Sequence, residues 1–485
     1  MSKDVLKGLN PELVWDRFYE ISQIPRPSKN EGKILEYIKE FCKKEDLKYK
    51  QDEAGNICVL VPATKGCEDK PVVILQGHVD MVCEKNKGTE HDFDNDPIKL
   101  AYKDGWVKAE GTTLGADNGI GVAAALAIVN DKEAVHGPLE ILCTVDEETG
   151  LNGAGKMDPK IISGKTLLNL DSEEDGAFYI GCSGGFGTTA KWKIPFRQIP
   201  SGNISFDISL TGLKGGHSGL EIQTGKANAL KLLARVLYAL PFEYHLTRIE
   251  GGNKRNAIPR EAEATIYIAP QNTAELKNIL QTLENEFRNE YKTSDGNATL
   301  KAEPSSATVD RVFEQEFTER LVKTLIAVPH GVINFSQDLP GLVETSTNLA
   351  IIRTEGETLS IITTQRSSVE SAKRYIAASV KSVFRLGGAE VATGDDYPGW
   401  KPNLDSQALK TAKGVYKRLF NAEPEIKAIH AGLECGILGD KSPGTDMISF
   451  GPTITGAHSP DEQVNVAAVE KFYFLLKAML KEYAK

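Results

Sequence analysis

Apolar residues recur along the chain in two spacings, one typical of helices and one typical of buried strands. Residues 31–45 place apolar side chains three and four positions apart, which predicts an amphipathic helix. Residues 72–75, 139–145 and 166–170 are short, mainly apolar runs, as in strands that are covered on both faces. An apolar helical segment lies between two of these runs, at residues 120–128. Strands that alternate with helices predict an α/β fold with a central sheet.

The character of the chain changes in its middle part. Residues 204–210 and 262–268 read as strands, the first with clear alternation, and residues 226–240 and 274–290 have helical spacing. Strand pairs packed by helices predict an α+β domain here. The turn-rich sequence GDDYPGW at residues 394–400 then precedes the return of helix and strand signals.

A histidine and an aspartate follow one of the predicted strands. His78 and Asp80 are two positions apart, so in extended chain their side chains point the same way. A carboxylate beside a metal-binding imidazole can orient the ring, and the pair therefore resembles half of a metal shell. Alone this spacing is a weak signal, because a histidine at a strand end is more often a satisfied polar residue.

Further acidic residues occupy comparable positions. Glu147, Glu148 and Asp171 follow two other predicted strands, and Asp117 lies on a glycine-rich loop before a helix. A second histidine, His458, occurs late in the chain. Acidic residues at strand ends are what an open α/β sheet uses to build a site. Two histidines and several carboxylates, with no cysteine among them, suit a pair of divalent ions.

These motifs together resemble the M20 family of co-catalytic metallopeptidases. QGHVDMV at residues 76–82, GTTLGADNGIG at 111–121, DEETGLNGA at 146–154 and GLECG at 432–436 are similar to the aminoacyl-histidine dipeptidases, also called Xaa-His dipeptidases or bacterial carnosinases. The resemblance runs essentially from end to end. It implies a mixed central sheet flanked by helices, of the two-zinc peptidase type, with an inserted lid and dimerisation domain.

The resemblance also implies how two metal ions would be held. A carboxylate has two oxygens able to bind both ions, and Asp117, central in the order of motifs, is the candidate bridge. In the family the peptide bond after this aspartate is cis. The two metal shells would then be completed by His78 with Asp171, and by Glu148 with His458. Zinc is the expected metal, and manganese and cobalt accept the same ligands.

Glu147 is left as the general base that activates a metal-bridged water for attack on the peptide carbonyl. Glu147 and Glu148 cannot point the same way if both lie in extended chain. One of them then binds metal while the other faces the water. Asp80 is assigned to orienting His78.

The middle domain carries candidate substrate-binding residues. His217 lies between glycines in GGHSG, and the family histidine at this place stabilises the substrate oxyanion, often in the partner subunit of a dimer. Asn348 and Arg366 resemble positions that hold the substrate carboxylate. Glu434 of GLECG is expected near the substrate, where it would receive a free α-ammonium or an imidazolium; the sequence leaves the choice open. A homodimer is expected.

Composition and charge argue against a nucleic-acid-binding, secreted or membrane protein. The formal net charge of −10 and the scattered lysines and glutamates argue against nucleic acid as a partner. The first residues lack the apolar core of a signal peptide, and no run approaches the length of a membrane span. The seven cysteines are irregularly spaced and read as reduced thiols. We therefore expect a cytoplasmic protein without a membrane partner.

The ligands come from both ends of the chain, which sets the expected domains. Residues 1–187 and 396–485 would form the catalytic metallopeptidase domain, and residues 188–395 the inserted domain. Hinges are expected near Gly187 and Gly394, where glycine and turn residues gather.

Three functions are compatible with a chain of this kind. The first is a dipeptidase that cleaves Xaa-His, including β-Ala-His (carnosine), and other small dipeptides. The second is another amide hydrolase of the same superfamily, a deacylase or an aminotripeptidase. The third is an inactive binding protein on the same scaffold, which would be expected to have lost Glu147 or a metal ligand. All of these residues are present, and the first reading is preferred.

Overall fold

The computed structural model describes residues 3–306 and 309–485, which form two compact units. Each unit has its own hydrophobic core. In the described chain, no helix is long and apolar enough to cross a membrane. The first unit consists of the chain up to Cys182 together with Trp400–Ala428 and Leu433–Lys485. The second unit consists of Ser183–Gly399 and Ile429–Gly432.

A mixed sheet forms the middle of the first unit. Within the described residues its strand order is β1-β2-β6-β3-β7-β23-β8-β22. The central strands β6, β3, β7 and β23 are parallel, while β1, β2 and β8 pair antiparallel. Every residue of β3 and β6 is buried, in agreement with the mainly apolar sequences of these strands. The strands are β1 (Lys48–Gln51), β2 (Ile57–Val61), β3 (Val73–His78), β6 (Leu139–Thr144), β7 (Thr166–Asn169), β8 (Ala177–Cys182), β22 (Glu425–Ile429) and β23 (Asp446–Ser449).

Helices flank this sheet, and the apolar helix α3 is the most deeply buried of them. It contacts β3 and packs against α1 and α11. A small antiparallel sheet, β24-β25-β5-β4, lies in the same unit. The mixed sheet with flanking helices confirms the predicted α/β fold. The remaining elements of the unit are α1 (Glu12–Ser22), α2 (Gly32–Lys44), α3 (Ala116–Asn130), α4 (Asn152–Lys156), α9 (Gln407–Phe420), α10 (Glu434–Lys441), α11 (Val466–Tyr483), β4 (Leu100–Lys103), β5 (Trp106–Ala109), β24 (Ile454–Thr455), β25 (Gln463–Asn465) and the 3-10 turns Lys3–Leu6 and Pro159–Ile161.

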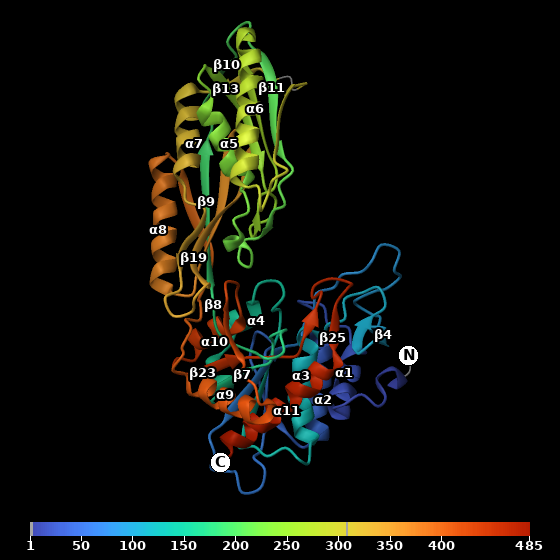
Figure 1. Ribbon diagram of the computed structural model, residues 1–485. Helices are drawn as coiled ribbons and strands as arrows, with labels where there is room; N and C mark the ends of the chain where they lie inside the picture. The colour runs from blue at the N-terminus through green and yellow to red at the C-terminus, as the bar shows by residue number, and fades with distance from the viewer. Residues whose placement is uncertain (1–2, 307–308) are drawn as a thin grey trace. The chain divides into compact units, whose positions relative to one another are not determined.

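The second unit is built on an antiparallel sheet of order β16-β11-β15-β13-β19-β20-β9-β21, with β18 paired to β19. Strands such as β20 alternate between buried and partly exposed residues, since helices α5 to α8 cover one face (Figure 1). The strands are β9 (Gly184–Lys193), β10 (Phe196–Gln198), β11 (Ile204–Thr211), β12 (Gly216–His217), β13 (Tyr244–Gly251), β14 (Ala257–Ile258), β15 (Ala262–Ile268), β16 (Thr299–Pro304), β17 (Arg311–Phe313), β18 (Gly331–Phe335), β19 (Val343–Glu355), β20 (Thr358–Ser367) and β21 (Glu390–Tyr397). The helices are α5 (Ala229–Ala239), α6 (Thr273–Glu290), α7 (Gln315–Ala327) and α8 (Glu370–Leu386), with 3-10 turns at Ile222–Thr224 and Pro270–Asn272.

The hinges expected near Gly187 and Gly394 are not turns. Gly187 lies within β9, Gly394 lies within β21, and the two residues pair with each other in the sheet. The first part of β9, GGFG, is rich in glycine and carries no strand signal, whereas Ala190 to Lys193 alternate between buried and exposed residues. Pairing with β20 on one side and β21 on the other makes it a strand. The second unit therefore starts at Ser183 and not at residue 188.

Candidate metal centre

Strand β3 ends at His78, close against the start of helix α3, where Asp117 and Asn118 have non-helical backbone angles and continue the preceding loop. A Cβ atom on Gly77 would collide with the side-chain amide of Asn118, so the close approach requires glycine. His78 is buried, and its two ring nitrogens face different carboxylates. Nδ1 lies 3.3 Å from Asp80 Oδ1, and Nε2 lies 3.0 Å from Asp117 Oδ1. The Asp80 carboxylate is therefore next to Nδ1 of the ring, and Nε2 faces Asp117.

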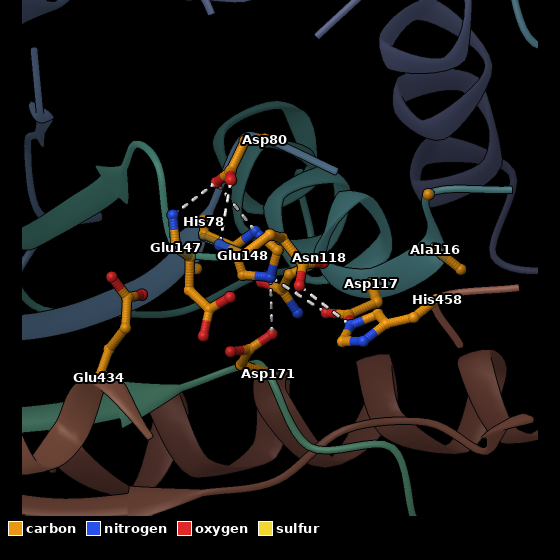
Figure 2. Close-up of polar contacts among 12 residues, drawn as sticks. His78, Asp80, Ala116, Asp117, Asn118, Glu147, Glu148, Asp171, Glu434 and His458 are labelled. Carbon is orange, nitrogen blue, oxygen red and sulfur yellow. Dashed lines mark hydrogen bonds and ion pairs between the residues drawn. The ribbon is translucent and has the colours of Figure 1, made fainter. Parts of the chain in front are cut away.

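Asp117 lies between two imidazoles. Its Oδ1 is 3.0 Å from His78 Nε2, and its Oδ2 is 3.1 Å from His458 Nε2 (Figure 2). The peptide bond from Asp117 to Asn118 is cis, as the family resemblance implies. Burial opposes ionisation, but hydrogen bonds with His458 and His78 outweigh it and hold the pKa of Asp117 well below its usual range. The two oxygens of one ionised carboxylate therefore serve two separate groups of side chains.

Two groups of possible metal ligands share Asp117. In each group the ligand atoms all lie within 4.8 Å of one another. Asp171 Oδ1 is 3.4 Å from His78 Nε2 in the first group. Glu148 Oε2 is 3.0 Å from His458 Nε2 in the second. The first group is His78, Asp117 and Asp171, and the second is Asp117, Glu148 and His458. A carboxylate shared between two such groups is suited to hold a pair of metal ions.

Residues 146–150 form a turn, so the condition that Glu147 and Glu148 lie in extended chain is not met. Asp146 has a φ of 49°, and the amide of Gly150 donates to the carbonyl of Glu147 at 2.9 Å. Strand alternation therefore does not separate the roles of Glu147 and Glu148. Both carboxylates can group with His78 within 4.8 Å. Their surroundings differ, because Glu148 pairs with His458 whereas Glu147 points toward Asp171 (Figure 2).

Asp80 connects the imidazole of His78 to this turn. Its Oδ1 accepts a hydrogen bond from the amide of Glu147 at 3.1 Å, and its Oδ2 accepts one from the amide of Glu148 at 3.2 Å. The hydroxyl of Ser28 donates to Oδ2 at 2.8 Å. Burial opposes the charge, but His78 and these donors outweigh it and lower the pKa of Asp80 to about 2. One ionised carboxylate thus orients a histidine and two glutamates.

Several carboxylates of this cluster are buried close together, and this affects their pKa values. Burial raises the pKa of Asp171 to about 7 despite the imidazole of His78. Burial also raises the pKa of Glu147 well above its usual range, and the carboxylates of Asp171 and Glu434 add to that shift. In the described structure, Glu148 Oε1 is buried without a hydrogen-bond partner. Buried carboxylates that repel one another, with one oxygen lacking a donor, are well suited to divalent cations.

Comparison with known proteins decides the family. The model of peptidase family M20/M25/M40 matches residues 74–482. The chain belongs to this family. The match includes every residue of the two ligand groups.

Relatives of this M20 peptidase are similar over nearly their full length. The cytosol non-specific dipeptidase of Escherichia coli (strain K12) is 42% identical over 480 residues, which cover 98% of this chain and 99% of that protein. The crystal structure of aminoacylhistidine dipeptidase from Vibrio alginolyticus superposes with a TM-score of 0.91 at 39% identity, over 98% of each chain. Aminopeptidase PepT from Bacillus cereus ATCC 10987 has a TM-score of 0.58 at 17% identity, over 98% of this chain and 100% of that one, and shares the fold.

In this M20 peptidase, Glu434 begins helix α10 in the first unit. It is fully buried, and its Oε2 accepts hydrogen bonds from Gln76 Nε2 at 2.6 Å and Thr144 Oγ1 at 2.7 Å. Burial raises the pKa of Glu434 to about 7. Within the part of the chain that the structure covers, its Oε1 is buried and has no hydrogen-bond partner. Its substrate role stays a prediction, and Oε1 is the atom available for it.

The other predicted substrate residues belong to the second unit. His217 ends the short strand β12, and Asn348 and Arg366 lie on the paired strands β19 and β20. Asn348 Nδ2 donates to the carbonyl of Ala257 at 2.8 Å, and Arg366 Nη1 donates to the hydroxyl of Tyr397 at 3.0 Å. Arg366 Nε and Asn348 Oδ1 are buried without a hydrogen-bond partner in the described chain.

Three buried polar residues are not among those expected from the sequence. Arg26 and Glu462 are buried beside the loop that carries Asp117, as described below. His430 is buried in the second unit with its Nε2 2.7 Å from the hydroxyl of Ser346. Glu462 stands four positions after His458 in a motif already recognised, so an acidic residue there was an available signal. Arg26 and His430 lie in stretches that offer no such signal.

Proposed function

We propose that this chain is a dinuclear-metal dipeptidase that hydrolyses Xaa-His dipeptides, including β-Ala-His (carnosine), and other small dipeptides. The observation that carries the proposal is the pair of ligand groups sharing Asp117 in a member of a peptidase family. Two full-length relatives support the substrate class, because one is named a non-specific dipeptidase and the other an aminoacylhistidine dipeptidase. A cytoplasmic location is proposed as well, since the first of these is a cytosol enzyme.

The proposed metal ligands are the two groups described above. Zinc is the proposed metal, with manganese or cobalt as alternatives, because imidazole and carboxylate ligands suit all three. When bound, such ions polarise the peptide carbonyl and lower the pKa of water. The first unit would then be the catalytic domain. The ligands are His78, Asp117, Asp171, Glu148 and His458.

Glu147 is the proposed general base. It would accept a proton from the attacking water and pass it to the departing amine. A base must be held at a defined place, and Asp80 provides this by accepting the Glu147 amide at 3.1 Å. The raised pKa of Glu147, caused mainly by burial, suits a group that must also release a proton as an acid.

His217 is the proposed donor to the substrate oxyanion. Its Nδ1 accepts hydrogen bonds from the amides of Gly219 at 3.2 Å and Leu220 at 3.0 Å. An imidazole nitrogen that accepts carries no proton, so the neutral ring holds its proton on Nε2. Burial lowers the pKa of His217, and the charge of Arg366 lowers it further, which favours that neutral form. The Nε2–H group is therefore already available to donate a hydrogen bond to the substrate oxyanion.

Two substitutions separate this donor from the turn that supports it. In His217→Asn, the side-chain oxygen can still accept from the amides of residues 219 and 220, but the Nε2–H is lost. Both His217→Asn and His217→Ala should lower kcat by about 10²-fold or more, the usual cost of one oxyanion donor. Metal content should not change, because no proposed ligand is touched. Wild-type kcat in His217→Asn would remove the residue from the mechanism.

The second unit is proposed as the lid and dimerisation domain of a homodimer. If the partner subunit supplies His217, then mixing His217→Ala chains with Glu147→Gln chains should restore part of the activity. One site of each mixed dimer would contain both intact residues. No recovery after confirmed subunit exchange would assign His217 to the same chain as the metal ligands.

The remaining substrate contacts follow from charge. Arg366 and Asn348 are proposed to hold the C-terminal carboxylate of the dipeptide, since a guanidinium can bind both carboxylate oxygens. Glu434 is proposed to receive a cation, which is either the α-ammonium or the imidazolium of the substrate. Its Oε1, buried without a partner among the described residues, is where such a cation would pair.

A substrate panel tests the proposed function against another M20 amide hydrolase. Ala-His and β-Ala-His should release free histidine, Ala-Ala should be cleaved, and acetyl-amino acids and tripeptides should be poor substrates. A chelator should abolish all of these activities, and zinc, manganese or cobalt should restore them. Liquid chromatography of the products measures each rate. Preferred cleavage of tripeptides or acetyl-amino acids would overturn the dipeptidase assignment.

A further inference from the structure

Glu462 is a buried acidic residue whose oxygens contact only main-chain donors of one loop among the described hydrogen bonds. It is 2% exposed. Its Oε2 accepts from the amides of Leu114 at 2.8 Å and Gly115 at 2.9 Å. Its Oε1 accepts from the amides of Ala116 at 2.7 Å and Asp117 at 3.2 Å. Four successive amides thus converge on one carboxylate from a segment about 350 residues away.

Arg26 holds the same loop from its carbonyl side. It is 2% exposed, and its Nη2 donates to the carbonyl of Gly115 at 2.5 Å. Its Nη1 donates to the carbonyls of Val79 at 3.0 Å and Asp80 at 2.8 Å. One guanidinium therefore joins the loop before α3 to the chain that follows His78. Separate donors on a planar fork make this bridge, which a lysine could not reproduce.

The two glycines of GADNG follow from this arrangement. A Cβ atom on Gly115 would lie 2.5 Å from Arg26 Nη2, and one on Gly119 would lie 2.7 Å from it. Gly115 also has a φ of 70°, where a side chain is strained. These glycines leave room for the guanidinium, which indicates that the motif encodes the Arg26 contact as well as the aspartate.

We propose that Arg26 and Glu462 are positioning residues that clamp residues 114–117 and so place Asp117 between the two ligand groups before metal binds. The inference rests on the proposed bridging role of Asp117. Glu462 lies on the same loop as His458, so the clamp also ties one ligand group to the other. Partners outside the ligand set that fix the ligands commonly contribute about 10- to 100-fold to metal affinity.

The carboxylate is the part of Glu462 that the clamp requires. Four amides need acceptors, and each of the two carboxylate oxygens of Glu462 accepts from two of them. Glutamine offers one oxygen, and its amino group would face amides that also donate. Aspartate keeps the charge on a side chain shorter by one methylene. The expected order of metal affinity is therefore wild type, then Glu462→Asp, then Glu462→Gln.

The first experiment uses wild-type protein and does not depend on a variant folding. Hydrogen exchange of the amides of residues 114–117 is compared between metal-free and zinc-loaded enzyme. A preformed clamp predicts rates that agree within about threefold, because Glu462 and not the metal protects these amides. Exchange that becomes tenfold faster or more on metal removal would overturn the proposal. This result is independent of whether Asp117 binds metal.

The second experiment compares Glu462→Gln and Arg26→Lys with Asp461→Asn, an exposed neighbour that loses the same charge as Glu462→Gln. Both clamp variants should bind cobalt about 10- to 100-fold more weakly than wild type. Visible absorption of the cobalt-loaded proteins should shift in the clamp variants and stay unchanged in Asp461→Asn. Folded clamp variants with wild-type affinity and spectrum would refute the clamp. Weak cobalt binding by wild type would instead count against the proposed function.

Discussion

Glu147→Gln enzyme is expected to turn over Ala-His about 10²- to 10⁴-fold more slowly than wild type while it still binds two metal ions. Glutamine keeps the size of the side chain and an acceptor oxygen, but it cannot take a proton at neutral pH. The amide of Glu147 remains bound to Asp80, so the turn should keep its shape. Steady-state kinetics and metal analysis of the same dialysed sample measure both quantities.

Glu148→Gln is the matched control, because it changes the next residue in the same way. Glu148 Oε2 lies 3.0 Å from His458 Nε2 in one of the ligand groups, so this variant should lose metal as well as activity. The two variants should therefore be separated by metal content and not by rate alone. Equal metal loss in both would show that the roles of base and ligand are assigned wrongly.

Asp117→Ala is expected to abolish dipeptide hydrolysis and to reduce the bound metal from two ions to one or none. The reason is that both ligand groups contain Asp117, so one substitution removes a donor from each. The neighbouring imidazoles of His78 and His458 lose partners at 3.0 and 3.1 Å and would separate more easily. Inductively coupled plasma mass spectrometry of the dialysed protein gives the metal content.

Asp69→Ala is a suitable control for this change, since Asp69 is an exposed aspartate of the first unit outside both ligand groups. It should keep two metal ions and full activity. Two ions in folded Asp117→Ala would exclude the bridging role, even if the activity were lost.

The sequence predicted the site best where a strand pattern and a polar residue coincide. The buried run of β3 placed His78 at a strand end, and Asp80 lies behind its imidazole in the structure. The resemblance to M20 peptidases supplied what local pattern does not. Bringing His458 to Asp117 requires the complete fold, because no propensity or periodicity joins residues that are so distant in sequence.

The failures have local physical causes. The distinction between Glu147 and Glu148 depends on extended chain, whereas Asp146 turns the chain with a φ of 49°. Strand β9 carries few apolar residues, and its place depends on the strands that flank it. In the sequence, Glu462 cannot be distinguished from an acidic residue on the surface. In the structure, four amides of a distant segment donate hydrogen bonds to it. Sequence patterns report burial of apolar residues, and they do not report burial of a charge.

The order of these groups along the chain has a consequence for biosynthesis. His78, Asp117 and Asp171 emerge early from the ribosome, whereas His458 and Glu462 follow about 290 residues later. At about 5–20 residues per second, the nascent chain spends roughly 15 to 60 s with one ligand group present and the second lacking its histidine. During that interval the loop before α3 also lacks its carboxylate anchor. If both groups bind metal as proposed, an ion captured during this interval would meet the first ligand group without the second.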